Sequence, residues 1–418
     1  MSRFGCAGVA LLLVSCAARA QVLPLGFPSN EDVDRALDSY PAVAAGQARI
    51  NAARANADML RVGSHEFILS GAFSRRTVER EGRFDESDAT LSRIVRLPGK
   101  ADLDRKAGAL GIDVAENLSE DMRHQAALLL SERWHDWLQA GEFVRRDTQA
   151  LTNQDAALTA VERRKDLRDA AQIDLDQARA ARAVVEAQLA ESRSLLEKAR
   201  VTLAAIFPEI PLSAEPPPLA DPQLPVQDVE VLRTLVIERS HEIRASEREA
   251  QRLSVVANRA RADRIPDPTV GVRVFRERGG LERGVGVSLS VPLGWGYRGA
   301  GAQRASAEAT AAEYDLAEVR RAIQAIADAD VSDVRTRIAA WTSMATSARS
   351  AAEAAARTQR GYQLGAIDLS DLLYIQKQAN DAHRAEIAAR DQASRAVIKI
   401  QIDSHVIWAP AHHDDVGP

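Results

Sequence analysis

The chain repeats one order of elements twice, and this duplication restricts its possible folds more than any other feature. Residues 32–207 have the pattern of an amphipathic helix, two short strands of alternating polarity, a very long helix, a break and a returning helix. Residues 228–402 show the same order. A duplication of this size places matching elements around a pseudo-symmetry axis. Because each repeat has only two strands, we expect these strands to pair with other chains, which predicts an oligomeric conduit.

The longest segments are predicted to be coiled-coil helices. Residues 294–365 carry apolar side chains in steps of three and four, with one stutter, and residues 99–168 repeat this pattern. Such spacing is typical of helices that pack side by side. At about 1.5 Å per residue each helix is about 100 Å long, whereas the returning helix 170–206 and the first helix 31–64 are about 55 Å and 50 Å. Two short helices end to end match one long helix, so we expect a helical cylinder about 100 Å tall.

The strands of the second repeat have one apolar face and one small or polar face. The alternating apolar residues are Val270, Val272, Val274, Val285, Val287, Leu289 and Val291. This pattern fits a transmembrane β-barrel with lipid outside and water inside. Residues 276–283 are expected to form a charged hairpin loop, and Trp295 and Tyr297 follow where interfacial aromatic residues belong. The alternative is a soluble hairpin that packs on one face.

The strands of the first repeat are less regular. Phe67, Leu69 and Phe73 suit one strand, but Leu91 in the second strand shares its parity with Arg93. An arginine facing lipid at mid-membrane costs about 2–4 kcal/mol, so either a bulge shifts the register or the strand lies elsewhere. Four strands cannot close a barrel, because the smallest known barrels have about eight, and open edges are not tolerated in lipid. Several chains must therefore contribute, and two, three or four satisfy this condition.

The N-terminus has the pattern of a targeting segment. Arg3 precedes an apolar stretch, and small residues follow up to Ala20. This pattern predicts a secretory signal peptide over residues 1–20, too short to span a bilayer. The sequence Leu-Val-Ser-Cys ending at Cys16 also fits a bacterial lipoprotein signal, in which residues 1–15 are removed and Cys16 is lipidated. Both alternatives stay open.

Composition restricts the partners and the class of fold. After the signal no run of roughly 18 apolar residues occurs, so no transmembrane helix is predicted and any membrane crossing must use strands. The net charge of −5 is small and the charges are interspersed, which argues against nucleic acid as a partner. Aromatic residues make up only 4% of the chain, as expected of long, closely packed helices.

The sequence predicts neither an enzyme nor a cofactor. Residues 294–299 match the dinucleotide motif G-x-G-x-x-G, but the strand before them is one-sided and the helix after them runs on for some 65 residues. We expect these glycines to turn the chain from barrel to helix. No Walker loop, zinc-ligand spacing or nucleophile elbow occurs elsewhere. The cluster His412-His413-Asp414-Asp415 suits a metal site, but a solvated tail is the preferred interpretation.

These features divide the chain into five parts. After the signal come a first repeat, residues 21–207, and a proline-rich linker, residues 208–227, which we expect to wrap the outside of the cylinder. A second repeat, residues 228–404, and a flexible tail, residues 405–418, complete the chain.

The break between the last two helices carries the most specific motif. Residues 362–373, Tyr-Gln-Leu-Gly-Ala-Ile-Asp-Leu-Ser-Asp-Leu-Leu, have a counterpart in residues 167–175 of the first repeat. With the repeat order and lengths, this motif resembles the TolC-like outer-membrane efflux duct family over nearly the whole mature chain. Residues 265–272 and 297–300 look most like the heavy-metal, cobalt–zinc–cadmium branch of that family.

The resemblance implies a periplasmic tip with two kinds of residue. In that family the turn narrows the duct and docks an adaptor protein. The expected docking residues are Leu167, Arg168, Asp169, Leu364, Gly365 and Ala366. The expected aperture residues are Asp174, Asp371 and Tyr374, with Tyr362 the next candidate. Arg168 departs from the family's usual glycine, and Tyr374 stands where some members place a second aspartate. The simpler interpretation of the two aspartates is a carboxylate that stabilises a helix N-terminus.

The fold class implied is mainly α with a small β part: a long α-helical barrel plus a transmembrane β-barrel formed jointly by an oligomer with four strands per chain. The family resemblance implies a homotrimer in the outer membrane of a Gram-negative bacterium, in contact with outer-membrane lipid and extending into the periplasm. It further implies a passive exit duct for substrates, metal cations among them, which works with a periplasmic adaptor protein and an RND-type inner-membrane pump. The rival interpretation is a periplasmic coiled-coil adaptor or scaffold protein of an export complex, without a barrel.

Overall fold

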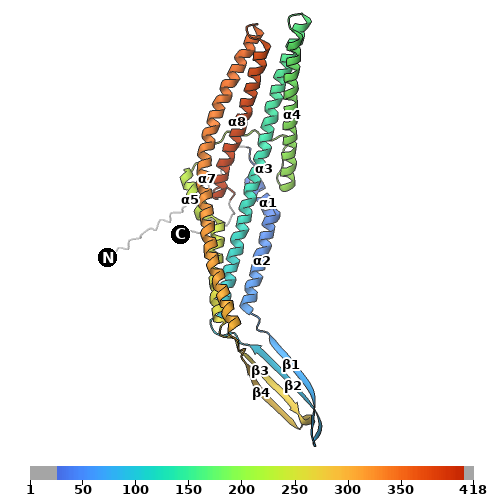
Figure 1. The fold of residues 1–418 in the computed structure, drawn as a ribbon, viewed down its shortest axis with the longest axis vertical. Helices are drawn as coiled ribbons and strands as arrows, with labels where there is room; N and C mark the ends of the chain where they lie inside the picture. Colours follow the sequence, from blue (N-terminus) through green and yellow to red (C-terminus); the bar gives the residue numbers. More distant parts are fainter. Residues whose placement is uncertain (1–25, 409–418) are drawn as a thin grey trace, which may run out of the picture.

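The computed structural model describes residues 26–408 and contains the predicted duplication (Figure 1). The first repeat comprises α1 (Asn30–Ser39), α2 (Pro41–Val62), β1 (Phe67–Val78), β2 (Gly82–Ile94), α3 (Lys100–Asp166) and α4 (Gln172–Ile206). The second comprises α5 (Val229–Arg239), α6 (His241–Ala262), β3 (Thr269–Glu277), the short 3-10 helix η1 (Arg278–Gly280), β4 (Glu282–Ser290), α7 (Gly296–Gln363) and α8 (Leu369–Asp403). The predicted signal peptide, the lipidation site Cys16 and the histidine cluster at 412–415 lie outside the described residues.

One helix was predicted before each pair of strands, and this prediction was wrong in both repeats. The chain breaks between α1 and α2 at Tyr40, where Pro41 opens the new helix. It breaks between α5 and α6 at Ser240, whose hydroxyl accepts a hydrogen bond from the amide of Ile243 (3.1 Å). Proline at a first helical position and serine at an N-cap are both helix-start signals, so each break is encoded locally.

The helices form a long rod with the sheet at one end and two helical hairpins at the other (Figure 1). α3 packs against α2 in the half near the sheet and against α4 in the other half, and α7 packs in the same way against α6 and α8. The expectation that two short helices match one long helix is therefore confirmed. Contacts of α3 with α6 and α8 join the repeats. No helix within residues 26–408 combines the length and hydrophobicity needed to cross a bilayer.

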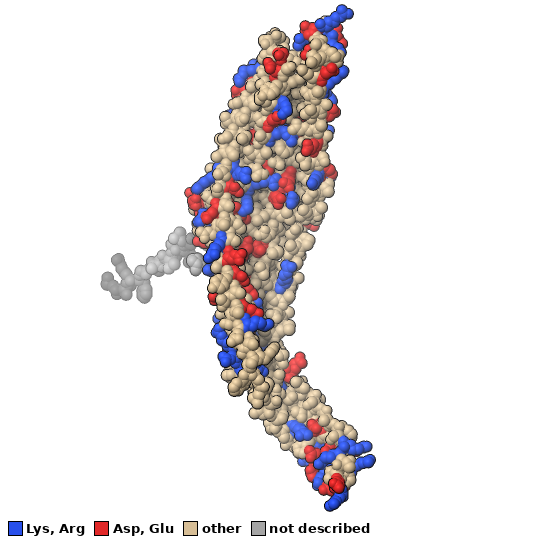
Figure 2. Space-filling model, viewed as in Figure 1, with Lys and Arg blue, Asp and Glu red and all other residues tan. Residues whose placement is uncertain are grey.

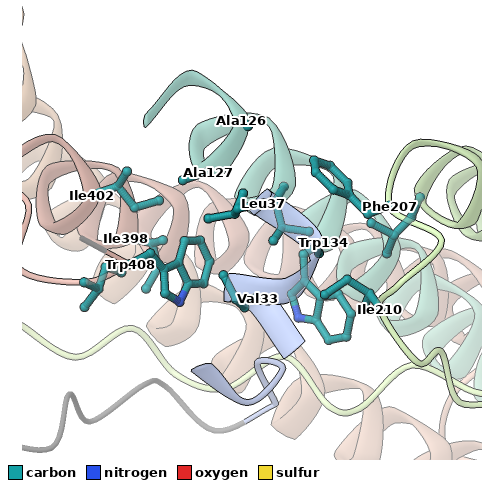
Figure 3. Close-up of a cluster of buried hydrophobic side chains, with 14 of the residues drawn as sticks. Val33, Leu37, Ala126, Ala127, Trp134, Phe207, Ile210, Ile398, Ile402 and Trp408 are labelled. Carbon is teal, nitrogen blue, oxygen red and sulfur yellow. The ribbon is translucent and has the colours of Figure 1, made fainter. Parts of the chain in front are cut away.

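A cluster of large buried side chains surrounds Trp134, midway along α3 (Figure 3). Trp134 and Trp137 of α3 meet edge to face, with ring centroids 5.0 Å apart, and the indole nitrogen of Trp134 donates to the carbonyl of Gly26 (3.0 Å). Phe207 after α4 and Ile398 of α8 complete this core from both repeats. Burying each such side chain contributes about 1.5–3 kcal/mol, so this cluster anchors the hairpins to the rest of the rod.

The proline-rich linker is bound along α3 and α8 by specific hydrogen bonds. The backbone amide of Leu219 donates to Glu142 of α3 (2.9 Å), and Arg390 of α8 donates to the carbonyl of Leu219 (3.1 Å). Arg145 donates to the carbonyl of Pro216 (3.1 Å). Proline carbonyls remain good acceptors although the residue has no amide, so the linker is held by side chains that reach it from the helices.

The four strands form one antiparallel sheet in the order β1-β2-β3-β4. Val272 lies opposite Val287, Val270 lies opposite Leu289, and Val274 lies opposite Val285. Residues directly opposite share a face, so the predicted apolar face is confirmed. Val287 is 86% exposed in the single chain. The sheet also corrects the predicted hairpin loop at 276–283, because β3 extends to Glu277 and β4 begins at Glu282.

Arg93 is on the apolar face, but it lies at the helix end of the sheet. The pairing of β1 with β2 is unbroken, so the bulge considered above is absent, and Arg93 lies opposite Phe67, the first residue of β1. β2 ends at Ile94, one residue after Arg93. The guanidinium lies 4.9 Å from the centre of the Phe67 ring and donates to the carbonyl of His65 (2.7 Å). At this margin the cost of an arginine falls to about 0–1 kcal/mol.

A buried lysine fixes the sheet to the helices. Lys100, at the start of α3, is 2% exposed, and its ammonium donates to Asp267 (2.8 Å) and to the carbonyl of Ile265 (2.8 Å). The same carboxylate of Asp267 accepts from the backbone amide of Leu97 (2.9 Å). The turns before α3 and before β3 are therefore joined, and residues 265–268 have a structural role at this junction.

Candidate functional site

The far end of the rod carries two equivalent turns, one between α3 and α4 and one between α7 and α8. Arg168 and Gly365 both adopt positive φ, 60° and 75°. The next residue closes the turn in each case: Asp169 donates its amide to the carbonyl of Arg164 (2.8 Å), and Ala366 donates to that of Gly361 (2.9 Å). Glycine adopts this conformation freely, whereas an arginine there costs about 1–2 kcal/mol. The departure at Arg168 therefore keeps the turn and adds backbone strain.

The two predicted aperture aspartates occupy the same place in their helices. Asp174 and Asp371 each stand at the third position, of α4 and α8 respectively. The carboxylate of Asp174 accepts a hydrogen bond from the backbone amide of Ala171 (3.0 Å). In α8 the cap is Asp368, which accepts from the amide of Asp371 (2.9 Å). Asp174 therefore caps its own helix, whereas the carboxylate of Asp371 accepts no hydrogen bond from the described residues.

A small core beneath the turns joins the two hairpins. It contains Val161, Leu175, Ala178, Tyr362, Leu369 and Leu372. Tyr362 is only 7% exposed, and its hydroxyl accepts from Arg164 of the other hairpin (3.3 Å). The interpretation of Tyr362 as a further aperture candidate was therefore wrong, because its ring packs between the hairpins. Tyr374 is exposed, and its hydroxyl accepts from Gln378 on the next turn of α8 (2.8 Å).

The predicted docking residues are the outermost part of each turn. Leu167 is 79% exposed and Leu364 is 84% exposed, and Asp169 forms an ion pair with Arg164 (3.0 Å). Arg168, Gly365 and Ala366 are also exposed. An exposed leucine at the end of each hairpin gives the tip an apolar surface with charged neighbours, which suits a protein partner.

A groove of about 970 Å³ runs between the hairpins behind the tip. Helices α3, α4, α7 and α8 all line it, with Tyr374, Lys377 and Asp381 along the α8 side. Among the residues that line it, Arg146 of α3 donates to Asn380 of α8 (2.9 Å), and Gln154 donates to Gln376 (3.1 Å). Polar pairs thus join α3 to α8 here, in place of the apolar seam expected between coiled-coil helices.

A buried ion pair joins three helices next to this groove. Asp147 of α3 is fully buried and accepts hydrogen bonds from Ser192 of α4 (2.6 Å) and from Arg384 of α8. The guanidinium of Arg384 also lies 4.4 Å from the centre of the Phe143 ring. The sequence pattern gives no signal for this pair, because neither residue interrupts its helix and the partners are far apart in the chain.

A second group of buried charges lies at the middle of the rod. The ammonium of Lys399 donates to Asp330 (2.6 Å) and to Asp403 (2.5 Å), and His124 lies 3.1 Å from Asp403. Burial and the neighbouring Asp403 raise the pKa of Asp330 to about 7. Burial also opposes ionisation of Asp403, but His124 and Lys399 outweigh it and lower the pKa of Asp403 to about 2. These ion pairs join α3, α7 and α8 at the middle of the rod.

Neither cluster is arranged as a metal centre. Over the part of the chain that the structure describes, no three or more histidine, cysteine, aspartate or glutamate side chains are placed to hold a metal ion. The groups that the tip presents are carboxylates, exposed leucines and amides.

No protein-family model and no curated protein matches the sequence. Solved structures match over nearly the whole chain. The outer-membrane channel OprN superposes with a TM-score of 0.77 at 21% identity, over 91% of this chain and 90% of that one. The outer membrane protein VceC from Vibrio cholerae gives 0.74 at 18%, over 90% and 99%. The CmeC outer membrane channel of Campylobacter jejuni gives 0.69 at 16%, over 90% and 85%. With its helical rod and four-stranded sheet, the chain has the fold of these outer-membrane channels.

Proposed function

We propose that the chain is one subunit of an outer-membrane exit duct, which conducts substrates passively and has no enzymatic activity. The observation that carries this proposal is the sheet. It has an exposed apolar face, and β1 and β4 leave its two edges without a partner strand in the described chain. In water such a sheet exposes an apolar face and unpaired backbone groups. In a closed barrel, lipid covers the apolar face and the edge strands pair with those of neighbouring chains. A periplasmic adaptor lies outside the bilayer, so an exposed apolar sheet face would give it no stability.

The outermost helices lie on the same two sides of the chain as the edge strands of the sheet (Figure 1). On one side β1 leads from α2, with α4 above it, and on the other side β4 leads into α7. Both sides present small residues. On α4, opposite the residues that α3 covers, these are Ala180, Ala183, Ala190 and Ser194; on α7 they are Ser343, Ser347, Ser350 and Ala354. Small residues let helices approach closely, so α4 of one chain would pack against α7 of the next.

Closure in this way pairs β4 of one chain with β1 of its neighbour. By similarity to the efflux duct family, three chains close the ring and give a homotrimer with four strands from each chain. The apolar face then contacts outer-membrane lipid, and Trp295 and Tyr297, 80% and 92% exposed, lie at the interface on the helix side. The rod, about 100 Å long, extends into the periplasm.

The proposed partners are a periplasmic adaptor protein, bound at the tip through Leu167 and Leu364, and an RND-type inner-membrane pump. The pump supplies the energy for export. Metal cations are the proposed substrates, which follows from the resemblance of residues 265–272 and 297–300 to the heavy-metal branch. Asp174 and Asp371 are proposed to surround the closed tip with negative potential that favours cations, and Tyr374 to line the same aperture.

Planar-bilayer recordings of the purified protein test this function. The parent protein should conduct ions and be blocked by multivalent cations. Replacing both Asp174 and Asp371 with alanine should weaken cation selectivity and this block, because a trimer would otherwise bring these like charges close together at one axis. Each single replacement should give an intermediate effect.

Asp315→Ala is the matched control, because it removes an exposed carboxylate of α7 far from the tip. Selectivity and block of the double variant that equal those of the parent would show that both aspartates are ordinary carboxylates at a helix N-terminus. Absence of any conductance from the parent would contradict the duct itself.

A further inference from the structure

The end of the sheet farthest from the helices carries charged residues on both of its faces. On the apolar face, Arg276 of β3 lies directly opposite Arg283 of β4, in the next row of that face after Val274 and Val285. Figure 2 shows charged side chains gathered at this end, beyond an uncharged middle of the sheet. Both arginines are exposed.

The opposite face carries the acidic residues of the same strands. Glu277 lies directly opposite Glu282. Arg76 on this face forms an ion pair with Glu86 (2.7 Å), and Arg273 lies 3.4 Å from Asp88. Cations here are therefore matched by carboxylates.

Arg276 and Arg283 lack such a match. Like charges directly opposite on neighbouring strands repel each other. Arg276 donates to the carbonyl of Gly279 (3.2 Å), which carries no net charge. Asp85, the carboxylate of this face, is already paired with Arg75 (2.7 Å). Among the described residues, neither Arg276 nor Arg283 has a carboxylate within ion-pair distance, so an external anion would relieve the repulsion.

The position of the pair identifies the chemistry of this anion. The guanidinium groups lie where the apolar face ends, next to valines that contact acyl chains in the proposed barrel. Planar guanidinium groups bind phosphate through paired hydrogen bonds. We propose that Arg276 and Arg283 bind the phosphate groups of lipid A, the phosphorylated glycolipid anchor of lipopolysaccharide. This rests on the proposed function, because the hairpins reach the outer leaflet only when the helices extend into the periplasm.

Native mass spectrometry of the full-length protein in mild non-ionic detergent, with added lipid A, measures this binding. The parent should bind phosphorylated lipid A and lose at least about tenfold in affinity for dephosphorylated lipid A, since hydrogen bonds to charged groups are involved. Arg276→Gln combined with Arg283→Gln should weaken binding of phosphorylated lipid A by a similar factor. Replacement of both residues with lysine should restore part of the affinity, because the charge is kept and the paired geometry is lost.

The matched control is Arg76→Gln with Arg273→Gln, which removes the same charge from the other face of the same sheet and should leave affinity within about twofold of the parent. Equal binding by the parent and the Arg276/Arg283 variant, or equal binding of both forms of lipid A, would overturn the proposal. So would equal affinity for phosphatidylglycerol, which would assign the site to any anionic headgroup. The spectra also report subunit number, so an intact oligomer without lipid counts against this site alone, whereas a monomer counts against the proposed duct.

Discussion

Val287→Arg is expected to prevent stable insertion of the protein into the outer membrane. Val287 lies opposite Val272 on the apolar face, in the middle of the sheet. An arginine facing lipid at that depth costs about 2–4 kcal/mol, and an oligomer incurs this cost once in every chain. The measurement is the amount of protein recovered in the outer-membrane fraction, normalised to total expression.

Ser288→Arg provides the matched control, because the neighbouring residue points to the opposite face, across from Gly271. This face borders water in the proposed barrel, so the variant should reach the membrane at close to the parent amount. Equal recovery of the two variants would show that the apolar face does not contact lipid.

Arg384→Leu is expected to destabilise the helical hairpins strongly. It leaves the carboxylate of Asp147, which is fully buried, without its counter-charge, while Ser192 still donates one hydrogen bond. Removal of one partner from a buried ion pair typically costs about 3–5 kcal/mol. Unfolding in denaturant, followed by the loss of helical circular dichroism, should show the transition of the variant at a clearly lower denaturant concentration.

The double variant Asp147→Leu with Arg384→Leu separates the charge from the packing. Replacing both partners of a buried pair with apolar residues is often close to neutral, so most of the stability should return. Arg357→Leu, at an exposed site of α7, is the surface control and should change stability by less than about 0.5 kcal/mol. A double variant as unstable as Arg384→Leu would show that shape at this site matters more than charge.

Sequence patterns predicted the helices well, because each long helix is specified by its own residues. The spacing of apolar side chains indicates α3 and α7, and both lie within a few residues of the predicted bounds. The breaks at Tyr40 and Ser240 were missed because amphipathic spacing continues on both sides, although Pro41 and Ser240 are helix-start residues.

Strand pairing was harder to predict, since the partner of each residue lies elsewhere in the chain. Arg93 looked like a residue at mid-membrane until its position opposite Phe67 placed it at the end of the sheet. Arg276 and Arg283 were assigned to a loop because charged residues surround a Gly-Gly pair, and only the register places them opposite each other in a strand pair. A local sequence pattern indicates which face of the sheet a residue occupies, but not how far along the sheet it lies.

The two turns followed from the duplication, because residues 167–175 and 362–373 are counterparts and both turns have the same positive φ and closing hydrogen bond, whereas their role as a tip came only from the family resemblance. The buried pair of Asp147 and Arg384 had no such signal. Each is an ordinary charged residue within a helical pattern, and only the packing of α3 against α8 brings them together.

Several chains are expected to close their sheet edges into one barrel, and the mass of the detergent-extracted protein tests this most directly. Size-exclusion chromatography with light scattering, corrected for bound detergent, should give three times the mass of the mature chain, together with the strand content of four strands per chain by circular dichroism. Open edges in lipid are not tolerated, so a folded monomer should not be found. A monodisperse monomer with intact strand content would contradict the account.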